Sequence, residues 1–593
     1  MTRRRASCAC CGAVFFLSLI LPFAARAQSS VAVLTGQYNN SRTGANLNET
    51  TLAPSNVSAG TFGLLFTQAV DGNIFAQPLY VPGLTINGAT HNVVFVATLN
   101  NSIFAFDADT AQPALWHASL GPTATVPVPA AVKIGILSTP VIDLNSGTLF
   151  VVTLTGESGA LVYRLHALNL LTGVEVTNIV VQGAVAGTGS DSQTWPCTSW
   201  NGGSVPPPCI PFKPVEQLQR PALLEDTNST IYLAFGTLSG AEANVPYHGW
   251  LFGYQYAASA FTQTLIFNST PSLTQKGPPC SGSNPPSNQC GHGGGIWMSG
   301  RGPALDTTGI YVVTGNGGFG GASSGNWGES ALRLNSSGVV ADSFTASTYA
   351  TLNAEDLDLG DGGVMLFTSA NATVPNLALA AGKTGTVYVM NCASLGGLTS
   401  NNASAVQKFT ATSAGCGTGP GQSRCYEIHS PALWNRPGVG SMLYVWGYGD
   451  VLRVWDFNDT ANQFQPDPNQ GTITVPNYPG GGLAVSANGN SGGIVWAIVP
   501  TSGSTPAQGA LYAFDATNVS TPLWMSTDYW FATKFTIPTI ANGKVYVPTS
   551  NSPPATSPKY QPQLRVYGLC GTCAQVSPVS RFQTGPQQQA AKR

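Results

Sequence analysis

The feature that most constrains the fold is one short sequence pattern that occurs eight times along the 593 residues. In each copy two runs of alternating apolar residues flank a polar turn, as in "NVVFVATLNNSIFAFDADT" at residues 92–110. The other copies lie at residues 147–173, 231–254, 310–334, 377–391, 442–457, 494–516 and 544–568. A repeat of this kind indicates one quasi-symmetric architecture rather than several unrelated domains.

A short motif with small residues or a proline precedes each copy and marks the start of an innermost strand. The eight motifs are QPL (77–79), TPV (139–141), RPA (220–222), GPA (302–304), GGV (362–364), SPA (430–432), GGL (481–483) and IPT (537–539). Small residues suit a crowded axis where backbones approach closely. Radial packing also protects the edges that eight separate small sheets would expose.

We therefore predict an all-β fold, a single eight-bladed β-propeller of four-stranded blades. The apolar run at residues 63–70 is expected to close the ring as the outer strand of the last blade. The predicted organisation is a signal peptide (1–27), an N-terminal lead-in (28–62), the propeller (63–570) and a disordered, Gln-, Ser- and Pro-rich tail (571–593).

The first residues have the pattern that predicts a secretion signal. Three arginines at positions 3–5 precede an apolar run at 13–23 and the cleavage-type sequence Ala-Arg-Ala at 25–27. An N-terminal anchor helix is the alternative, but the run is short for a bilayer. No later stretch is apolar enough to span a membrane, so a secreted or extracytoplasmic protein is expected.

The charge content excludes a class of partner. Only 8% of residues are charged and the net charge is −2, without a basic patch, so nucleic acid is not an expected ligand. In a eukaryotic host the protein would be a glycoprotein. Its sequons are Asn39, Asn48, Asn56, Asn100, Asn228, Asn268, Asn335, Asn371, Asn402, Asn458 and Asn518.

Nine cysteines follow the predicted signal, and eight of them form close pairs. The pairs are Cys197 with Cys209, Cys280 with Cys290, Cys416 with Cys425, and Cys570 with Cys573. An oxidising compartment favours local disulfides that staple loops. Cys392 is left over, either free or competing for Cys416 or Cys425. Metal binding by the cysteines is the weaker alternative, because no pair matches a second pair at zinc spacing.

Across roughly residues 70–568 the chain resembles the pyrroloquinoline quinone (PQQ) repeat propellers of the quinoprotein alcohol dehydrogenase superfamily. The turns "FAFDADT" and "LNLLTG" are typical of these repeats. In that superfamily a Ser-Gly-Ala-Glu segment supplies a calcium ligand, and "SGAE" at 239–242 matches it, ending in Glu242. A Gly-Gly-x-x-Trp segment supplies the indole on which the quinone stacks, and "GGIW" at 294–297, preceded by Gly293, matches it and ends in Trp297.

The resemblance continues on the next blades. "TGN" at 314–316 matches a second calcium ligand, Asn316, and Lys383 before "GTVYV" fits the basic residue that contacts the quinone oxygens. The resemblance thus implies PQQ and Ca²⁺ as cofactors. Hard Ca²⁺ prefers oxygen ligands, the metal polarises a quinone carbonyl, a nearby cation stabilises charge, and an indole offers a flat stacking surface.

The chain departs from the superfamily at the catalytic base. The expected Gly-Asp-Asn segment is replaced by "GNWGE" at 325–329, without an aspartate, so Glu329 would have to act as the base from a shifted position. The "DLD" stretch at 356–358, followed by Asp361, is similar to a family Asp-x-Asp stretch but lacks its tryptophan. The adjacent-cysteine pair is also missing. Without a fused haem domain, electrons would pass to an external acceptor.

Two arginines precede innermost strands of adjacent blades, Arg220 and Arg301. Each is predicted either to face the channel mouth, where Arg301 would contact the cofactor, or to satisfy carbonyl groups of the loops.

Two functions therefore stay open. The first is a PQQ- and Ca²⁺-dependent oxidoreductase acting on an alcohol or sugar. The second is a non-catalytic secreted propeller that binds protein or glycan, because propellers host both kinds of function.

Overall fold

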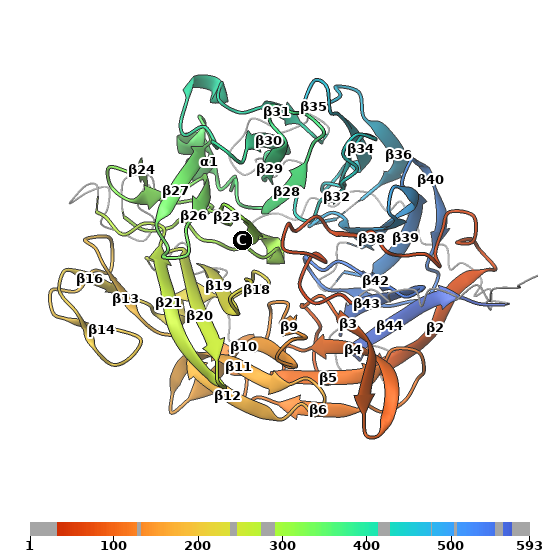
Figure 1. The fold of residues 1–593 in the computed structure, drawn as a ribbon, viewed down its shortest axis with the longest axis horizontal. Coiled ribbons are helices and arrows are strands. Elements are labelled where there is room, and N and C mark those ends of the chain that lie inside the picture. Colours follow the sequence, from red (N-terminus) through yellow and green to blue (C-terminus); the bar gives the residue numbers. More distant parts are fainter. Residues whose placement is uncertain are drawn as a thin grey trace, which may run out of the picture.

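The computed structural model describes residues 32–126, 132–237, 246–273, 291–412, 427–475, 477–502, 507–551 and 561–571. These residues form eight small antiparallel sheets arranged radially around one axis, most of them four-stranded (Figure 1). The prediction of an all-β, eight-bladed propeller is therefore confirmed.

The first four blades follow the chain from the axis outwards. Their strands are β3 (Leu79–Ile86), β4 (Ala89–Ala97), β5 (Ser102–Asp107) and β6 (Trp116–Ser119) in blade 1; β9 (Val141–Asp143), β10 (Thr148–Glu157), β11 (Ala160–Asn169) and β12 (Glu175–Val180) in blade 2; β17 (Gln217–Leu218), β18 (Leu224–Glu225), β19 (Thr230–Thr237), β20 (Trp250–Ala257) and β21 (Ala260–Asn268) in blade 3; β22 (Ala304–Asp306), β23 (Gly309–Val313), β26 (Ser330–Leu334) and β27 (Val340–Thr345) in blade 4.

The other four blades repeat this order. Their strands are β28 (Val364–Thr368), β29 (Asn376–Ala381), β30 (Thr386–Asn391) and β31 (Gln407–Thr410) in blade 5; β32 (Ala432–Trp434), β33 (Met442–Val445), β34 (Val451–Asn458), β35 (Gln463–Phe464) and β36 (Asn469–Thr474) in blade 6; β37 (Gly482–Asn488), β38 (Ser491–Pro500), β39 (Gly509–Asp515) and β40 (Asn518–Met525) in blade 7; β41 (Phe531–Ala532), β42 (Thr539–Ala541), β43 (Lys544–Ser550), β44 (Gln563–Leu569) and β2 (Phe62–Ala69) in blade 8.

Short elements decorate the loops. They are β1 (Ala45–Asn46), β7 (Ala124–Val126), β8 (Val132–Ile134), β13 (Ala184–Ala186), β14 (Cys197–Thr198), β15 (Ser204–Val205), β16 (Cys209–Pro211), β24 (Phe319–Gly321), β25 (Asn326–Trp327), the helix α1 (Tyr349–Glu355) and single 3₁₀ turns at Pro214–Glu216, Met298–Gly300 and Ser400–Asn402. Within the described ranges, no helix is long and apolar enough to cross a membrane.

The sequence motifs predicted to start the innermost strands lie where expected. In seven blades the innermost strand begins within its motif, and in blade 3 β18 begins two residues after it. The second strands are buried on both faces, as in β19, whose first seven residues are all buried. Such burial between neighbouring sheets explains why these strands are almost continuously apolar. Trp250, Trp434 and Trp496 are among the largest fully buried side chains.

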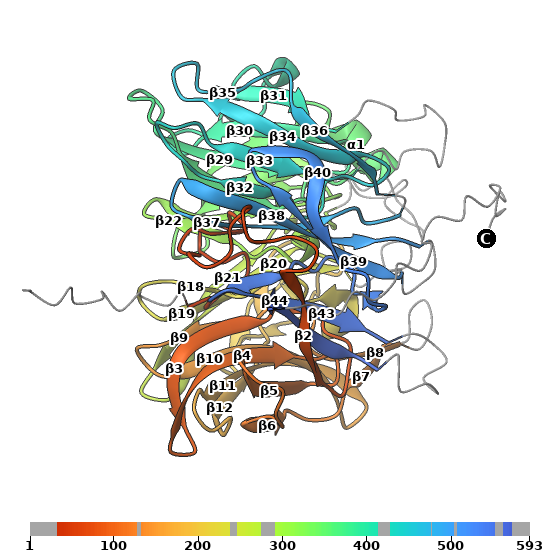
Figure 2. The same ribbon diagram turned by 90° about the vertical axis from the view of Figure 1, so that its right-hand side faces the viewer.

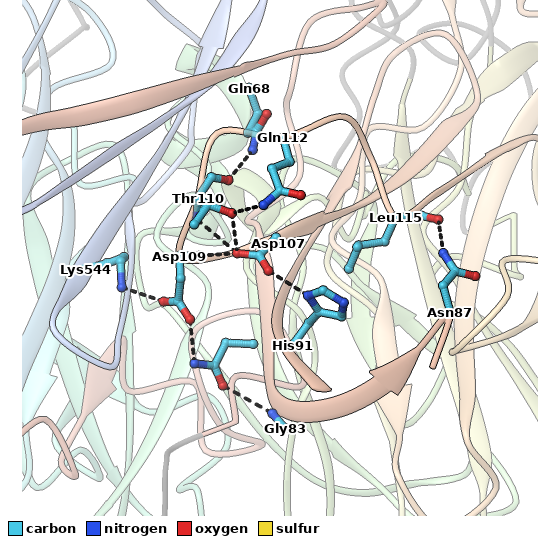
Figure 3. A network of polar contacts seen from close by, with 11 residues as sticks. Gln68, Gly83, Asn87, His91, Asp107, Asp109, Thr110, Gln112, Leu115 and Lys544 are labelled. Carbon is cyan, nitrogen blue, oxygen red and sulfur yellow. Dashed lines mark hydrogen bonds and ion pairs between the residues drawn. The ribbon is translucent and has the colours of Figure 1, made fainter. Parts of the chain in front are cut away.

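The ring closes as predicted, because β2 pairs with β44 as the outer strand of blade 8 (Figure 2). Side chains reinforce the junction between blades 8 and 1 (Figure 3): Lys544 contacts Asp109 at 2.6 Å, and Gln68 Nε2 donates to the carbonyl of Thr110 at 3.0 Å. Asp107 accepts from the backbone N–H groups of Asp109 and Thr110, which fixes the turn that carries both partners. Strand pairing within blade 8 and side-chain contacts between blades 8 and 1 thus close the ring together.

The lead-in segment before β2 also forms hydrogen bonds with the propeller. Between Val33 and Asn46 it hydrogen-bonds the innermost region of all eight blades in chain order. The contacts are Val33 with Tyr80, Leu34 with Ile142, Thr35 with Leu223, Asn40 with Leu305, Ser41 with Leu366, Thr43 with Leu433, Gly44 with Val485, and Asn46 with Ile540. This segment therefore follows the inner wall of the ring and gives the innermost strands a common partner on the axis side.

The structure describes only some of the predicted cysteine pairs. Cys197 and Cys209 form the predicted disulfide, and Cys392 is a buried free thiol. The pairs 280/290 and 416/425 and Cys573 lie outside the described residues, as does the predicted signal peptide. Among the sequons, Asn268 and Asn402 are buried in the fold, so a glycan on either would require local unfolding.

Candidate functional site

The predicted site residues come from loops at one end of the channel. In an antiparallel blade, the loop that enters the innermost strand and the loop that leaves the second strand lie at the same end. Trp297 enters β22 and Asn316 leaves β23 in blade 4, and Lys383 leaves β29 in blade 5. Glu242 leaves β19 in the chain, but it lies outside the described residues. Its role as a metal ligand stays a prediction.

Close backbone contact brings the Trp297 and Asn316 loops together. Gly294 N–H donates to the Asn316 carbonyl at 2.6 Å, and Gly315 N–H donates to the Gly295 carbonyl at 3.0 Å. A side chain at Gly293 would overlap the Asn316 backbone, and Gly293 also has a positive φ of 84°. The glycines around these two residues therefore permit an approach that any larger residue would prevent.

Asn316, Asp356, Asp358 and Lys383 form one polar cluster. Lys383 Nζ lies 2.9 Å from Asp356 Oδ1 and 2.5 Å from Asp358 Oδ2. Asn316 donates through its side-chain Nδ2 to Asp356 at 2.8 Å and through its backbone N–H to Asp358 at 2.7 Å. Its remaining polar atom, Oδ1, is buried without a hydrogen-bond partner. An orphaned amide oxygen beside two carboxylates is a donor set suited to a hard cation.

The charge of Lys383 is strongly stabilised. Burial opposes the charge, but Asp358 and Asp356 outweigh it, and the pKa of Lys383 is raised. Its ammonium group also lies 5.8 Å from the centroid of the Trp297 ring. The structure thus brings three predicted residues, Trp297, Asn316 and Lys383, into one cluster and adds two aspartates that sequence reasoning treated only as a similarity.

Glu329 lies next to this cluster but is fully buried, with a φ of 52°. Its Oε2 accepts the backbone N–H of Leu359 at 2.6 Å, and Oε1 has no partner. Burial, assisted by the negative charge of Asp358, raises the pKa of Glu329 well above its ordinary value. The full burial of Glu329 keeps its carboxyl group away from solvent, and its assignment as the catalytic base stays a prediction.

Arg301 is 1% exposed, and its guanidinium donates to the carbonyls of Gly362, Pro431 and Arg42. Burial lowers its pKa to about 9, so it keeps its charge at neutral pH. Arg220 similarly donates to the carbonyls of Leu137, Lys534 and Phe535. Both contact sets match the loop-carbonyl role, and contact between Arg301 and a cofactor stays a prediction.

Trp297 is half-buried and connects the polar cluster to an aromatic group on the other side of the channel mouth. Its ring centroid lies 5.8 Å from that of Phe535 and 6.5 Å from that of His429. His429 in turn packs against Phe535 at 4.8 Å and against Tyr478 at 4.9 Å. One continuous row of side chains therefore runs from blade 4 to blades 6, 7 and 8.

Sequence reasoning missed a second charged cluster around His429. Its Nδ1 lies 2.7 Å from Asp361 and its Nε2 lies 2.9 Å from Glu427, while Ser299 Oγ donates to Asp361 at 2.9 Å. Burial opposes the imidazolium, but Asp361 outweighs it and the pKa of His429 is raised. A usable signal existed, because His429 directly precedes the "SPA" motif of blade 6, and Phe535 stands two residues before "IPT" in blade 8.

A pocket of about 850 Å³ opens beside His429. Its wall includes Phe75, Tyr448, Tyr478, Lys534 and Phe535, from the entry loops of blades 1, 7 and 8 and an exit loop of blade 6. Neither Trp297 nor Lys383 lines it. Its volume lies in the range of small-molecule sites, roughly 300–1,000 Å³.

An eight-bladed ring with charged and aromatic loops at one channel end defines the class to which known structures can be compared. The chain resembles a quinohemoprotein alcohol dehydrogenase from Pseudomonas putida HK5 (TM-score 0.55, 14% identity, 94% of this chain and 83% of that chain) and one from Comamonas testosteroni (0.57, 14%, 95% and 83%). It also resembles a europium-containing methanol dehydrogenase (0.55, 12%, 91% and 98%).

These similarities show a shared fold, the eight-bladed propeller of the quinoprotein alcohol dehydrogenases, as the sequence motifs predicted. No known family model matches the chain, and no curated protein matches its sequence. The comparison therefore extends to architecture, and the chemistry has to be argued from the site.

Proposed function

We propose that this protein is a secreted quinoprotein-like oxidoreductase that uses PQQ and Ca²⁺ to oxidise an alcohol or a sugar and passes electrons to an external acceptor. The observation that carries the proposal is the buried, unpartnered Oδ1 of Asn316 beside Asp356 and Asp358. Three oxygen-bearing side chains at one point, two of them anionic, are the ligands that Ca²⁺ prefers.

The residues present fit such a metal. Asn316 and Asp358, with Asp356 and the predicted ligand Glu242, would hold the ion, and Trp297 and Lys383 would face the quinone. When bound, the quinone would supply a two-electron acceptor and Ca²⁺ would polarise its carbonyl. Lys383 holds a full positive charge within 3 Å of both aspartates, so it can stabilise negative charge that develops nearby.

The proton of the substrate hydroxyl needs an acceptor among the chain's own carboxylates. Asp358 has a side chain that is 9% exposed and hydrogen-bonded by Lys383 and by the Asn316 backbone. Glu329, the base predicted from the sequence, is buried behind it with a raised pKa. We therefore assign the proton-accepting step to Asp358 before Glu329, because Asp358 lies within the Asn316–Lys383 cluster whereas Glu329 is fully buried behind it.

One observation favours the alternative of a non-catalytic secreted propeller that binds a protein or glycan. The Trp297 ring already contacts Phe535 and His429, so a cofactor would have to stack on its remaining surface. The two functions make different predictions for cofactor binding.

The test is calorimetric titration of PQQ into the mature chain with and without Ca²⁺. We expect saturable, Ca²⁺-dependent binding that Glu242→Ala and Asn316→Ala abolish. Asn145→Ala, an exposed asparagine in the β9–β10 turn at the opposite end of the channel, should bind as the unmodified protein does. Absence of PQQ binding by the folded protein would refute the oxidoreductase and leave the binding propeller.

A further inference from the structure

Three metal-ligating side chains meet between the entry loops of blades 5 and 6. They are Asp361, before β28, and Glu427 and His429, before β32, and all three are buried. One ligand atom from each residue lies within 4.8 Å of the other two. In the part of the chain that the structure describes, no other three carboxylate, histidine or cysteine side chains lie so close together. A tetrahedral ion with bonds of about 2.0–2.2 Å needs its ligands about 3.4 Å apart, so small side-chain shifts would complete this geometry.

One oxygen of this cluster is buried without a partner. Asp361 is fully buried, and its Oδ1 accepts from Ser299 Oγ at 2.9 Å and lies 2.7 Å from His429 Nδ1. Its other oxygen, Oδ2, has no hydrogen-bond partner. A buried carboxylate oxygen without a partner costs free energy, and a bound cation would remove that cost. Oδ1 is thus held by the protein, and Oδ2 is left for a ligand.

The charges of the cluster do not balance. Glu427 Oε2 lies 2.9 Å from His429 Nε2, so the imidazole lies between two carboxylates. A protonated His429 can neutralise one of them, and the second negative charge stays buried. Lys383, from the loop after β29, is engaged by Asp356 and Asp358. A divalent cation bound to the two carboxylates and to a neutral His429 would balance the cluster, because buried charge is costly unless it is paired.

A buried histidine in blade 2 shows what an ordinary pair looks like. His166, in β11, pairs with one carboxylate, Glu175, at 2.6 Å, and its Nε2 contacts Thr153 Oγ1 at 2.9 Å. Glu175 is exposed, so water reaches its carboxylate. The second carboxylate and the buried oxygen without a partner therefore distinguish the His429 cluster from such a pair.

The kinds of ligand atom in the cluster favour zinc. An imidazole nitrogen with two carboxylate oxygens suits Zn²⁺, whereas Ca²⁺ takes about six to eight oxygen ligands. An ion can reach the cluster because His429 lines the pocket of about 850 Å³. We propose that Asp361, Glu427 and His429 form a zinc site, with the fourth tetrahedral position left to water. The site uses none of the ligands predicted for Ca²⁺, so it does not rest on the proposed function.

The test is calorimetric titration of ZnCl₂ into the full mature chain, which is first freed of metal with EDTA, dialysed and placed in excess CaCl₂. We expect a saturable zinc site that Ca²⁺ does not block. X-ray absorption of the protein with one equivalent of zinc should show one imidazole and otherwise oxygen ligands at about 2.0–2.2 Å. Absence of saturable zinc binding by the folded protein would leave His429 as a protonated bridge and overturn the proposal. A second imidazole or a sulfur ligand would also overturn it, because the ion would then lie elsewhere.

Two variants locate the ion, Asp361→Asn and His429→Asn. Each should weaken zinc binding at least about a hundredfold, because loss of a residue that only hydrogen-bonds a metal ligand already costs about 10–100-fold. The matched control is His166→Asn, which removes a buried histidine paired with a carboxylate and a threonine in blade 2 and should leave zinc binding unchanged. Urea unfolding in EDTA shows whether each variant folds, and the X-ray absorption of the unmodified protein decides for a variant that does not. Equal zinc affinities of Asp361→Asn and His166→Asn would refute the assignment.

A further variant separates this proposal from the proposed function. Asn316→Ala should bind zinc as the unmodified protein does, even though it is expected to lose Ca²⁺-dependent PQQ binding. Loss of zinc binding in Asn316→Ala but not in Asp361→Asn would move the ion to the Asn316–Lys383 cluster and overturn the proposal. If zinc binds as expected and PQQ with Ca²⁺ does not bind, the zinc site stands and the oxidoreductase fails. If PQQ binds with Ca²⁺ and zinc does not bind, the oxidoreductase stands and the zinc site fails.

Discussion

The two sides of the channel mouth differ in the kind of side chains that they present. On blades 4 and 5, Lys383 neutralises Asp356 and Asp358 within 3 Å, and one amide oxygen of Asn316 is left unused. On blades 6 to 8, aromatic rings surround a pocket of about 850 Å³. The first side is a cluster of charged and polar side chains, and the second is a cavity lined by aromatic rings. One end of the propeller therefore presents two chemically different surroundings.

Lys383→Met should have the largest effect on folding stability, because it leaves Asp358 buried without its cation. Removing one partner of a buried ion pair typically costs about 3–5 kcal/mol of folding stability. The free energy of unfolding, measured with urea in EDTA, should fall by an amount in this range. CaCl₂ should then raise the melting temperature of the variant more than that of the unmodified protein, because a cation can replace the lysine.

Lys408→Met is the matched control for this change. Lys408 is exposed and lies over Tyr388 with no acid among its contacts in the described structure, so its loss should cost less than about 1 kcal/mol. Equal losses in the two variants would show that Lys383 is not a neutralising residue.

Two histidines should give opposite pH dependences of the free energy of unfolding. His248, in the loop that enters β20 behind the polar cluster, contacts Thr270 Oγ1 and the Ser190 carbonyl, and burial lowers its pKa from 6.5 to about 4. Its contribution to stability is present above pH 6.5 and is lost as the pH falls towards 4. By linkage this loss amounts to about 3 kcal/mol. The His248→Asn variant should lack this acid-side decline in urea titrations between pH 4 and 8.

His429 on the aromatic side should show the reverse sign. Asp361 and Glu427 raise its pKa, so its stabilising contribution is complete below about pH 6.5 and is lost as the pH rises through the folded value. His429→Asn should therefore lose more stability at pH 6 than at pH 9. The same sign of pH dependence in both histidine variants would contradict the assignment of opposite environments.

The features that could be predicted from the sequence are those that depend on local interactions. Innermost-strand motifs such as "TPV" and "GPA" gave the blades because turn chemistry and alternation are local properties. Trp297, Asn316 and Lys383 were found from motif order. The Val33–Asn46 segment along eight innermost strands could not be predicted, because its hydrogen bonds join residues up to 494 positions apart and six of the eight contacts use backbone groups that any sequence provides.

The cluster of Asp361, Glu427 and His429 was missed for a related reason. Its members come from the entry loops of blades 5 and 6, and no spacing within one segment brings them together. The sequence left two roles open for Arg301, contact with the cofactor or hydrogen bonds to loop carbonyls. Both roles place an arginine next to an innermost strand. Its contacts with three carbonyls come from residues 259, 61 and 130 positions away.

The strain at Phe535 gives a smaller test of the aromatic side. Glycine adopts a φ of 61° at little cost, whereas alanine pays about 1–2 kcal/mol there. Phe535→Gly should therefore be more stable than Phe535→Ala by about 1 kcal/mol in urea denaturation. At Tyr478, where φ is not positive, the order should reverse, with Tyr478→Gly less stable than Tyr478→Ala. The same order at both positions would argue that Phe535 is not strained.

Lys534→Gln should change stability least. An exposed cation over aromatic rings contributes about 0.5–1 kcal/mol, so the free energy of unfolding should fall by no more than this. Lys383 and Lys534 both lie close to aromatic rings at the same channel end, and Lys383 is held between two carboxylates. A loss at Lys534→Gln as large as that of Lys383→Met would contradict this difference between the two lysines.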